Sequence, residues 1–293
     1  ASSDTAADNV AIGMGAIDAI TTGDKNIAIG RNAGGALTTG DRNVFIGSES
    51  GDAATEASQN TGVGNDAFTS LTDGDHNVGI GVNVFAALTT GHRNISIGQT
   101  SSDGFDTEDD NLAIGTGALG GPVAGGEYNI AIGNQALDAL TSGDQNVAIG
   151  FASGTALNSG ANNTFVGNAS GAAQTTASNN VLIGGDAGAA LTTGGDNTFI
   201  GYTAGDGHDA ETNNLGIGKA ALGGPIAGGE YNVAIGNNTL DALTSADFVT
   251  VVGYDAGGAI TTGGYNTLIG HEAGHTMTSG NVNTAVGHHA LGT

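Results

Sequence analysis

The sequence predicts an all-β protein, a parallel β-solenoid of about 17 coils with 17 or 18 residues in each coil. The first observation is a pentad that occurs seventeen times: Asn, then Val, Ile, Leu or Thr, a variable residue, Ile or Val, and Gly, with Val249 replacing Asn once. The second observation is the spacing, because successive pentads begin 17 residues apart except for two steps of 18, which start at Asn111 and Asn214. A fixed period of this length is typical of proteins in which each repeat forms one coil.

Each pentad predicts a short strand. We number the positions of a coil from the first pentad residue, so that Asn26 is position 1 and Gly30 is position 5. Positions 2 and 4 are mostly β-branched, which favours a strand over a helix. Because side chains alternate along a strand, positions 2 and 4 share one face, which we expect to be the interior of the coil.

The first and last pentad residues are predicted to form the corners of the coil. Gly at position 5 can adopt a backbone conformation with positive φ, which suits a corner. Asn at position 1 tolerates the left-handed region and forms local hydrogen bonds, and stacked copies would form a ladder of amides. The copies that we take as representative structural residues are Asn26, Gly30, Asn43, Gly47, Asn129, Gly133, Asn146, Gly150, Asn266 and Gly270.

The second half of each coil has its own apolar position, position 12, followed by Thr-Thr-Gly or a similar turn sequence. Leu37 and Leu191 are examples. We therefore expect two short strands and two turns in a coil, which gives a flattened roll whose apolar residues are buried by stacking on neighbouring coils.

Position 3 is expected to point outward, although it is never charged. An exposed row of small or apolar residues suggests a lateral interface, such as the axis of a homotrimer. The alternative is a tightly wound coil with small outward residues. The larger candidate interface residues are Phe45, Phe165, Leu182, Phe199, Val251 and Leu268.

Residues 1–293 are interpreted as a single solenoid domain, because no linker or change of composition interrupts the repeats. Near-identical segments around Pro122 and Pro225 reveal a super-repeat of six coils, 5 × 17 + 18 = 103 residues. The extra residue in these coils should form a bulge. Both ends of the sequence resemble half-coils, which leaves two interpretations: a piece of a longer chain, or subunits that stack end to end.

The composition excludes several partners. The formal net charge is −24, with five Lys and Arg residues in total, and such a surface repels nucleic acids and anionic membranes. No apolar run is long enough to span a membrane, so no membrane insertion is expected. The absence of Cys excludes disulfides and thiolate metal sites.

Acidic residues recur shortly before the pentad Asn, and the densest group lies in one coil. Stacked carboxylates and turn carbonyls are ligands that Ca²⁺ prefers. A calcium site is therefore one prediction, and a solvated charged edge that blocks unwanted sheet pairing is the alternative. The candidate ligands are Asp103, Asp106, Glu108, Asp109 and Asp110.

Histidines gather in the last two pentad repeats. His271 to His275 match the zinc-protease motif H-E-x-x-H, but that motif needs a helix, and this stretch follows a predicted strand. His271 and His288 share position 6 of consecutive coils, so their rings could stack about 5 Å apart and bind a transition metal. No catalytic site is predicted, and we expect no enzyme activity.

The pentad followed by A-[LG]-x-x-L-T-T-G-x-x-N resembles the repeats in the head domains of trimeric autotransporter adhesins. It also resembles the arrays of phage-type tail fibres, most closely in residues 26–47, 129–150 and 266–287. This resemblance implies a left-handed parallel β-roll, usually a homotrimer, that presents a rigid surface for attachment.

We therefore expect a non-enzymatic structural or adhesive protein, located extracellularly or on a virion or cell surface. It would self-associate and bind a cell-surface or glycan receptor. One alternative is the subunit of a filament or sheath that stacks end to end, with Ca²⁺ as a candidate cofactor. The other is an ice- or glycan-binding module, since regular rows of Thr such as Thr21, Thr38 and Thr55 suit an ice-binding surface.

Overall fold

The computed structural model describes residues 6–122, 125–224 and 228–292, and it confirms the predicted all-β parallel solenoid. The chain divides into two compact units, residues 1–145 and residues 146–293. Each coil contributes one strand of three residues. The strands of the first unit are β1 (Val10–Ile12), β2 (Ile27–Ile29), β3 (Val44–Ile46), β4 (Thr61–Val63), β5 (Val78–Ile80), β6 (Ile95–Ile97), β7 (Leu112–Ile114) and β8 (Ile130–Ile132).

The second unit continues the same pattern of three-residue strands. They are β9 (Val147–Ile149), β10 (Thr164–Val166), β11 (Val181–Ile183), β12 (Thr198–Ile200), β13 (Leu215–Ile217), β14 (Val233–Ile235), β15 (Thr250–Val252), β16 (Thr267–Ile269) and β17 (Thr284–Val286).

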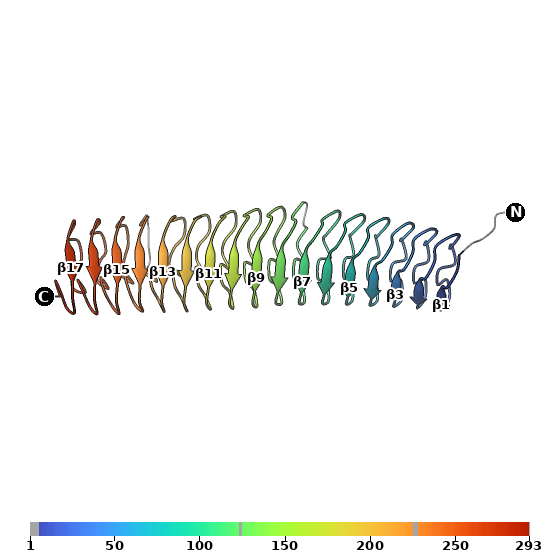
Figure 1. Ribbon diagram of the computed structural model, residues 1–293, viewed down its shortest axis with the longest axis horizontal. Coiled ribbons are helices and arrows are strands. Elements are labelled where there is room, and N and C mark those ends of the chain that lie inside the picture. Colours follow the sequence, from blue (N-terminus) through green and yellow to red (C-terminus); the bar gives the residue numbers. More distant parts are fainter. Residues whose placement is uncertain (1–5, 123–124, 225–227, 293) are drawn as a thin grey trace. The chain divides into compact units, whose positions relative to one another are not determined.

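Within each unit, successive strands pair in parallel and in register, as Figure 1 shows coil by coil. Val10 pairs with Ile27 in the first unit, and Thr164 pairs with Val181 in the second, so residues 17 apart lie over one another. The register shift is 18 residues at Leu112–Ile130 and at Leu215–Val233. The strands of the longer coils therefore stay in register with their neighbours, and the extra residue of each longer coil lies outside its strand.

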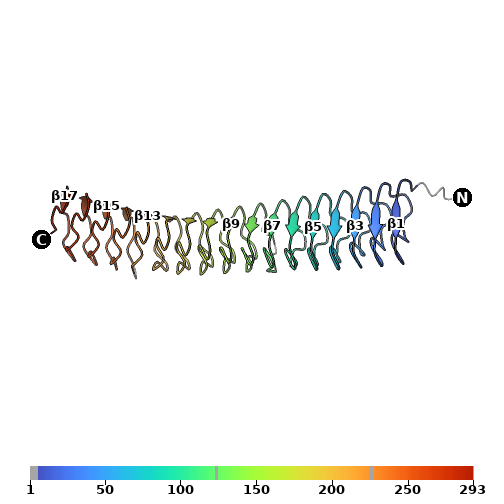
Figure 2. The same ribbon diagram turned by 90° about the horizontal axis from the view of Figure 1, so that it is seen from below.

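The prediction of two strands per coil is wrong. In the described residues the second half of each coil consists of turns and bends, and the strands line one side of the coils, as Figure 2 shows for β13 to β17. Backbone groups in this half still pair with the next coil, for example through the N–H of Thr38, which donates to the Thr55 carbonyl at 2.9 Å. The coils thus stack through hydrogen bonds on both sides, but only the pentad is extended.

The pentad glycine is required by geometry. Gly30 has φ of 140°, a conformation that side chains disfavour. A Cβ at this residue would lie 2.3 Å from the carbonyl oxygen of Gly47 in the next coil. Any other residue would push two coils apart, which explains Gly at position 5 in every pentad.

The pentad asparagines form the expected ladder of amides. The backbone N–H of Asn43 donates to the side-chain Oδ1 of Asn26 at 2.9 Å, and the Asn43 side-chain Nδ2 donates across its own coil to the Ala57 carbonyl at 2.6 Å. The left-handed residue is the one before the Asn, such as Lys25 at φ of 60°. The expectation that the Asn itself adopts the left-handed conformation was therefore wrong: its side chain is needed for hydrogen bonding.

Val249 interrupts this ladder. Its backbone N–H still donates a hydrogen bond to Oδ1 of Asn232 in the preceding coil, at 2.9 Å. A valine side chain has no oxygen to offer to the next coil, and Asn266 instead directs its Nδ2 to the carbonyls of Gly263 and Gly280.

The interior of the coils is lined by position 3, and not by positions 2 and 4 as the sequence suggested. The six predicted interface residues are buried, with at most 1% of each side chain exposed. They cannot form an outward contact row, so this prediction is wrong. The residues concerned are Phe45, Phe165, Leu182, Phe199, Val251 and Leu268.

Position 3 shares a narrow interior with position 9, and the two compensate for each other in size. Phe45 faces Gly51, where an added Cβ would lie 2.6 Å from the phenylalanine ring. In the next coil the sizes are exchanged, and a Cβ added to Gly62 would lie 2.9 Å from Phe68. In these coils one of the two positions is large and the other is small, because close packing leaves no room for two large side chains. In the coils of β2, β6 and β9 both positions are small.

The extra residue of the two longer coils lies between the pentad Asn and the backbone carbonyl that its side chain contacts later in the same coil. The Nδ2 of Asn111 donates to Gly126, 15 residues ahead, whereas Asn94 donates to Glu108, 14 residues ahead. Asn214 repeats the longer step with Gly229. The predicted bulge overlaps residues 123–124 and 225–227, which lie outside the described residues.

Candidate functional site

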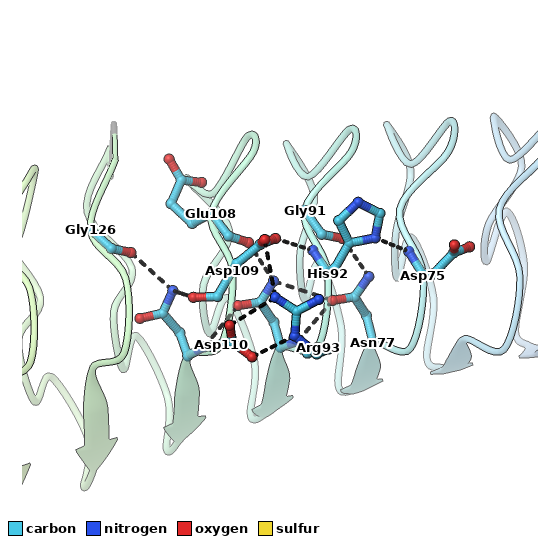
Figure 3. A network of polar contacts seen from close by, with 11 residues as sticks. Asp75, Asn77, Gly91, His92, Arg93, Glu108, Asp109, Asp110 and Gly126 are labelled. Atoms are coloured by element: carbon cyan, nitrogen blue, oxygen red, sulfur yellow. Dashed lines mark hydrogen bonds and ion pairs between the residues drawn. The ribbon is translucent and has the colours of Figure 1, made fainter.

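The five predicted calcium ligands occupy the coil that contains β6, but their carboxylates have different partners, as Figure 3 shows for Glu108, Asp109 and Asp110. Glu108 is 2% exposed, and its Oε2 accepts hydrogen bonds from the backbone N–H groups of Asp106 and Thr107 at 2.6 and 3.0 Å. Its Oε1 accepts from Gly125 N–H in the next coil at 2.9 Å. Glu108 thus supports the turn by satisfying three backbone amides.

Asp109 and Asp110 are paired with Arg93 on the preceding coil (Figure 3). The guanidinium contacts Asp110 through two nitrogens at 2.7 and 2.8 Å and Asp109 at 3.3 Å. The hydrogen bond from Arg93 lowers the pKa of Asp110. This ion pair is exposed, so it contributes little to stability, but it neutralises charge where a cation was predicted.

The carboxylates of Asp106 and Asp103 have different surroundings. The Asp106 carboxylate accepts a hydrogen bond from the Thr89 hydroxyl at 2.7 Å. Asp103 is half-buried, and its pKa is raised by burial and by the charge of Asp138. Among the described residues, no three of the five acids come close enough to hold one ion. The prediction of a calcium site here is therefore not supported by the geometry.

The outward face of the strands is uncharged and largely apolar, which the sequence interpretation missed. Positions 2 and 4 carry Val, Ile, Leu or Thr in every coil and never a charged residue. Ile80, Ile95 and Ile97 are 40%, 41% and 37% exposed. The sequence carries a weak trace of this arrangement, because positions 3 and 9 are never both large in the same coil, as two positions that share one interior would require.

A second exposed row consists of stacked aromatic rings in the last residue of the coil, directly before the next pentad. The ring centroids of Tyr231 and Phe248 lie 5.1 Å apart, and those of Phe248 and Tyr265 also lie 5.1 Å apart. The rings stack face to face along the coils, so they cover one another's faces and present mainly their edges to solvent.

Two further sequence motifs, H-E-x-x-H and the rows of Thr, can be placed in the structure. His271 to His275 follow β16 in a turn, and the described residues contain no helix that could carry the H-E-x-x-H geometry. Hydroxyls of the Thr rows form hydrogen bonds with the backbone of the next coil. The hydroxyl of Thr38, for example, donates to the Thr55 carbonyl at 3.0 Å. No pocket is found in the described parts of the chain.

Comparisons with known proteins identify no relative. No protein-family model matches the chain, and neither the curated proteins nor the solved structures contain a significant match. Among the described residues, no helix has the length and apolar character needed to cross a membrane.

Proposed function

We propose that this chain is a non-enzymatic structural or adhesive protein of the extracellular space or of a virion or cell surface. Its coils would hold a regular apolar sheet face against other copies of the same chain. The observation that carries this proposal is the outward face of the strands, where position 4 is Ile or Val in every coil and position 2 is Val, Ile, Leu or Thr, with no charged residue in either row. Soluble monomers rarely expose continuous apolar surface of this kind, and such surfaces usually mark contacts.

A second copy of the chain is the partner that best fits these rows. They present one side chain per coil, at the spacing of about 4.8 Å between paired strands. Another copy carries the same spacing, so it can place a side chain against every coil. The acidic residues lie outside positions 2 to 4 in every coil, and the net charge of −24 therefore need not enter the contact. Lateral association between copies therefore stays part of the proposal, but through positions 2 and 4 of the strand in place of position 3.

A matched pair of variants tests this proposal. Ile97→Lys places a charge in the outward row, whereas Gln99→Lys adds the same charge two residues away, outside the strand. Burying an unpaired ammonium group is costly, so Ile97→Lys should weaken association by at least about tenfold, or about 1.4 kcal/mol. Gln99→Lys should leave it unchanged.

The measurement is the mass in solution by light scattering across a range of concentrations. The wild-type chain should give a multiple of 28.3 kDa, with three copies as the arrangement that the adhesin resemblance implies. A wild-type monomer at high concentration would refute lateral association. Equal effects of the two lysine variants would show that net charge, and not the sheet face, controls assembly.

An ice-binding surface is a second candidate, supported by the regular outward Thr residues at position 2 of β15, β16 and β17: Thr250, Thr267 and Thr284. Thermal hysteresis of the wild-type protein is the readout, and its absence removes this candidate. An end-to-end filament is the remaining alternative, and negative-stain microscopy with and without a chelator separates it from lateral association.

A further inference from the structure

We propose that His271, His288 and His289 form a binding site for a divalent transition-metal ion of the Zn²⁺ class, with Glu272 as a carboxylate partner that positions the ligands. This proposal is independent of the function proposed above. These three histidines are the one group in the described residues that offers three metal-ligating atoms close together, all within 4.8 Å of one another.

The coil geometry brings the three rings to one place. His271 and His288 each follow a pentad glycine at position 6 of consecutive coils, and their rings stack with centroids 5.1 Å apart. His289 lies edge-on to both, with its centroid 4.1 Å from that of His288 and 6.0 Å from that of His271. The stacking of coils thus places two imidazoles over one another, and the residue next to one of them supplies the third.

The separations suit a metal after small side-chain rotations. Zn–N bonds of about 2.0–2.1 Å in a tetrahedron place ligand nitrogens about 3.3 Å apart. The ring nitrogens here lie within 4.8 Å, and all three histidines are exposed. Exposed side chains can rotate to close this difference without disturbing the packed interior, and solvent can supply the fourth ligand.

Glu272 and the charge of the protein favour a bound cation. Glu272 Oε2 lies 2.9 Å from His289 Nε2, and Glu272 Oε1 lies 3.7 Å from His271 Nδ1. A carboxylate that accepts a hydrogen bond from a ligating histidine fixes its ring orientation and raises its basicity. No Lys or Arg occurs after Lys219, and the chain as a whole carries a net charge of −24, which attracts divalent ions.

The site differs from the zinc-protease motif in its ligand set. His275, the second histidine of H-E-x-x-H, lies outside the three-residue group, with its ring centroid 6.3 Å from that of His289. The metal would be held by residues of two coils, so it would act as a clamp between them. The chemistry is binding, with no reaction assigned to it.

Isothermal titration of the full chain with ZnCl₂ tests the proposal, and Co²⁺ absorption in the visible range gives a second readout of ligand geometry. We expect one Zn²⁺ per chain. His288→Ala should lower the affinity at least tenfold, and Glu272→Gln should lower it about 10-fold, as loss of a carboxylate partner does elsewhere. Ca²⁺ should not compete, because imidazole ligands do not suit it.

His76→Ala is the matched control, because it removes an exposed histidine from a distant coil and should leave the affinity unchanged. His288→Gln serves as a replacement if the alanine variant does not keep the wild-type circular dichroism spectrum. Absence of saturable Zn²⁺ binding would overturn the proposal. Equal losses in the His76 and His288 variants would also overturn it, because they would indicate non-specific binding.

Discussion

The coils that contain β6 and β12 are equivalent in the 103-residue super-repeat, yet they fill the same interior in different ways. The β6 coil has Ser96 at position 3 and Phe105 at position 12, and both are buried. The β12 coil has Phe199 at position 3 and His208 at position 12, also buried. Each interior holds one phenylalanine, but on opposite sides of the coil. The volume of the interior is maintained, whereas the position of the large residue is not.

The turns of the same two coils are nearly identical. Glu211 accepts hydrogen bonds from the backbone N–H groups of Asp209, Ala210 and Gly228 at 2.8, 3.1 and 2.9 Å. Glu108 makes the equivalent three bonds in the β6 coil. The comparison teaches that the backbone hydrogen bonds restrict the sequence residue by residue, while the interior restricts only the sum of side-chain volumes.

The largest expected loss of stability comes from changing the total side-chain volume inside one coil. Phe199→Ala should destabilise by about 3–5 kcal/mol through the cavity that it leaves. Gly205→Leu should cost a similar amount, because a Cβ at this residue would lie 2.3 Å from the Phe199 ring. The double variant should lose about 1–3 kcal/mol less unfolding free energy than the two single losses add up to. Urea unfolding measures these free energies.

The backbone permits this exchange, since Leu222 occupies the same position in the next coil at φ of 56°. The same cycle with Phe165 and Gly171, where the Cβ distance is 2.7 Å, is a control in a separate coil. Strict additivity in both cycles would contradict volume compensation.

The next effect tests the shared turn. Glu211→Ala leaves three backbone amides without their acceptor, and a hydrogen bond to a charged group contributes about 1.5–3 kcal/mol. Water can reach part of this turn, so we expect a loss of about 2–4 kcal/mol in unfolding free energy. Glu108→Ala should lose the same amount within about 1 kcal/mol. Unequal losses would show that the two turns are not equivalent.

The third prediction concerns His208, whose pKa is lowered to about 4 by burial, while the nearby Glu211 carboxylate and the backbone of Leu222 act in the opposite direction. Within the part of the chain that the structure describes, neither ring nitrogen of His208 has a hydrogen-bonding partner. The unfolded chain binds the proton more tightly, with a pKa of about 6.5, so stability is lost as the pH falls from about 6.5 to about 4. The loss should be about 2–3 kcal/mol at pH 4.5.

His208→Phe removes the titrating imidazole and introduces Phe, the residue that the β6 coil has at the equivalent position, Phe105. The difference in unfolding free energy between the variant and the wild type should therefore grow between pH 7 and pH 4.5. Taking the difference cancels the titration of the many carboxylates. Phe105→His should introduce the same dependence in the β6 coil, and a pH-independent difference in either variant would show that the imidazole is hydrated in the folded state.

The repeat alone determined the solenoid, its register and the contacts that the pentad Asn and Gly make between coils. Asn26 and Gly30 recur at fixed spacing because each forms contacts with its own copies in adjacent coils, as the Asn43-to-Asn26 bond at 2.9 Å illustrates. A contact between identical positions leaves a visible period in the sequence.

Only the tertiary structure decided which face of the strand is buried and which acids share a partner. Alternation separates two faces but does not say which is inside, so Phe45 was assigned to the surface. It lies inside because Gly51, six residues later, leaves room for its ring. The acids near Asp103 were grouped by sequence proximity, but Arg93 and backbone amides of the neighbouring coils draw their carboxylates apart. Contacts between different positions of the coil do not produce a repeated residue in the sequence. They depend on how the chain closes each coil.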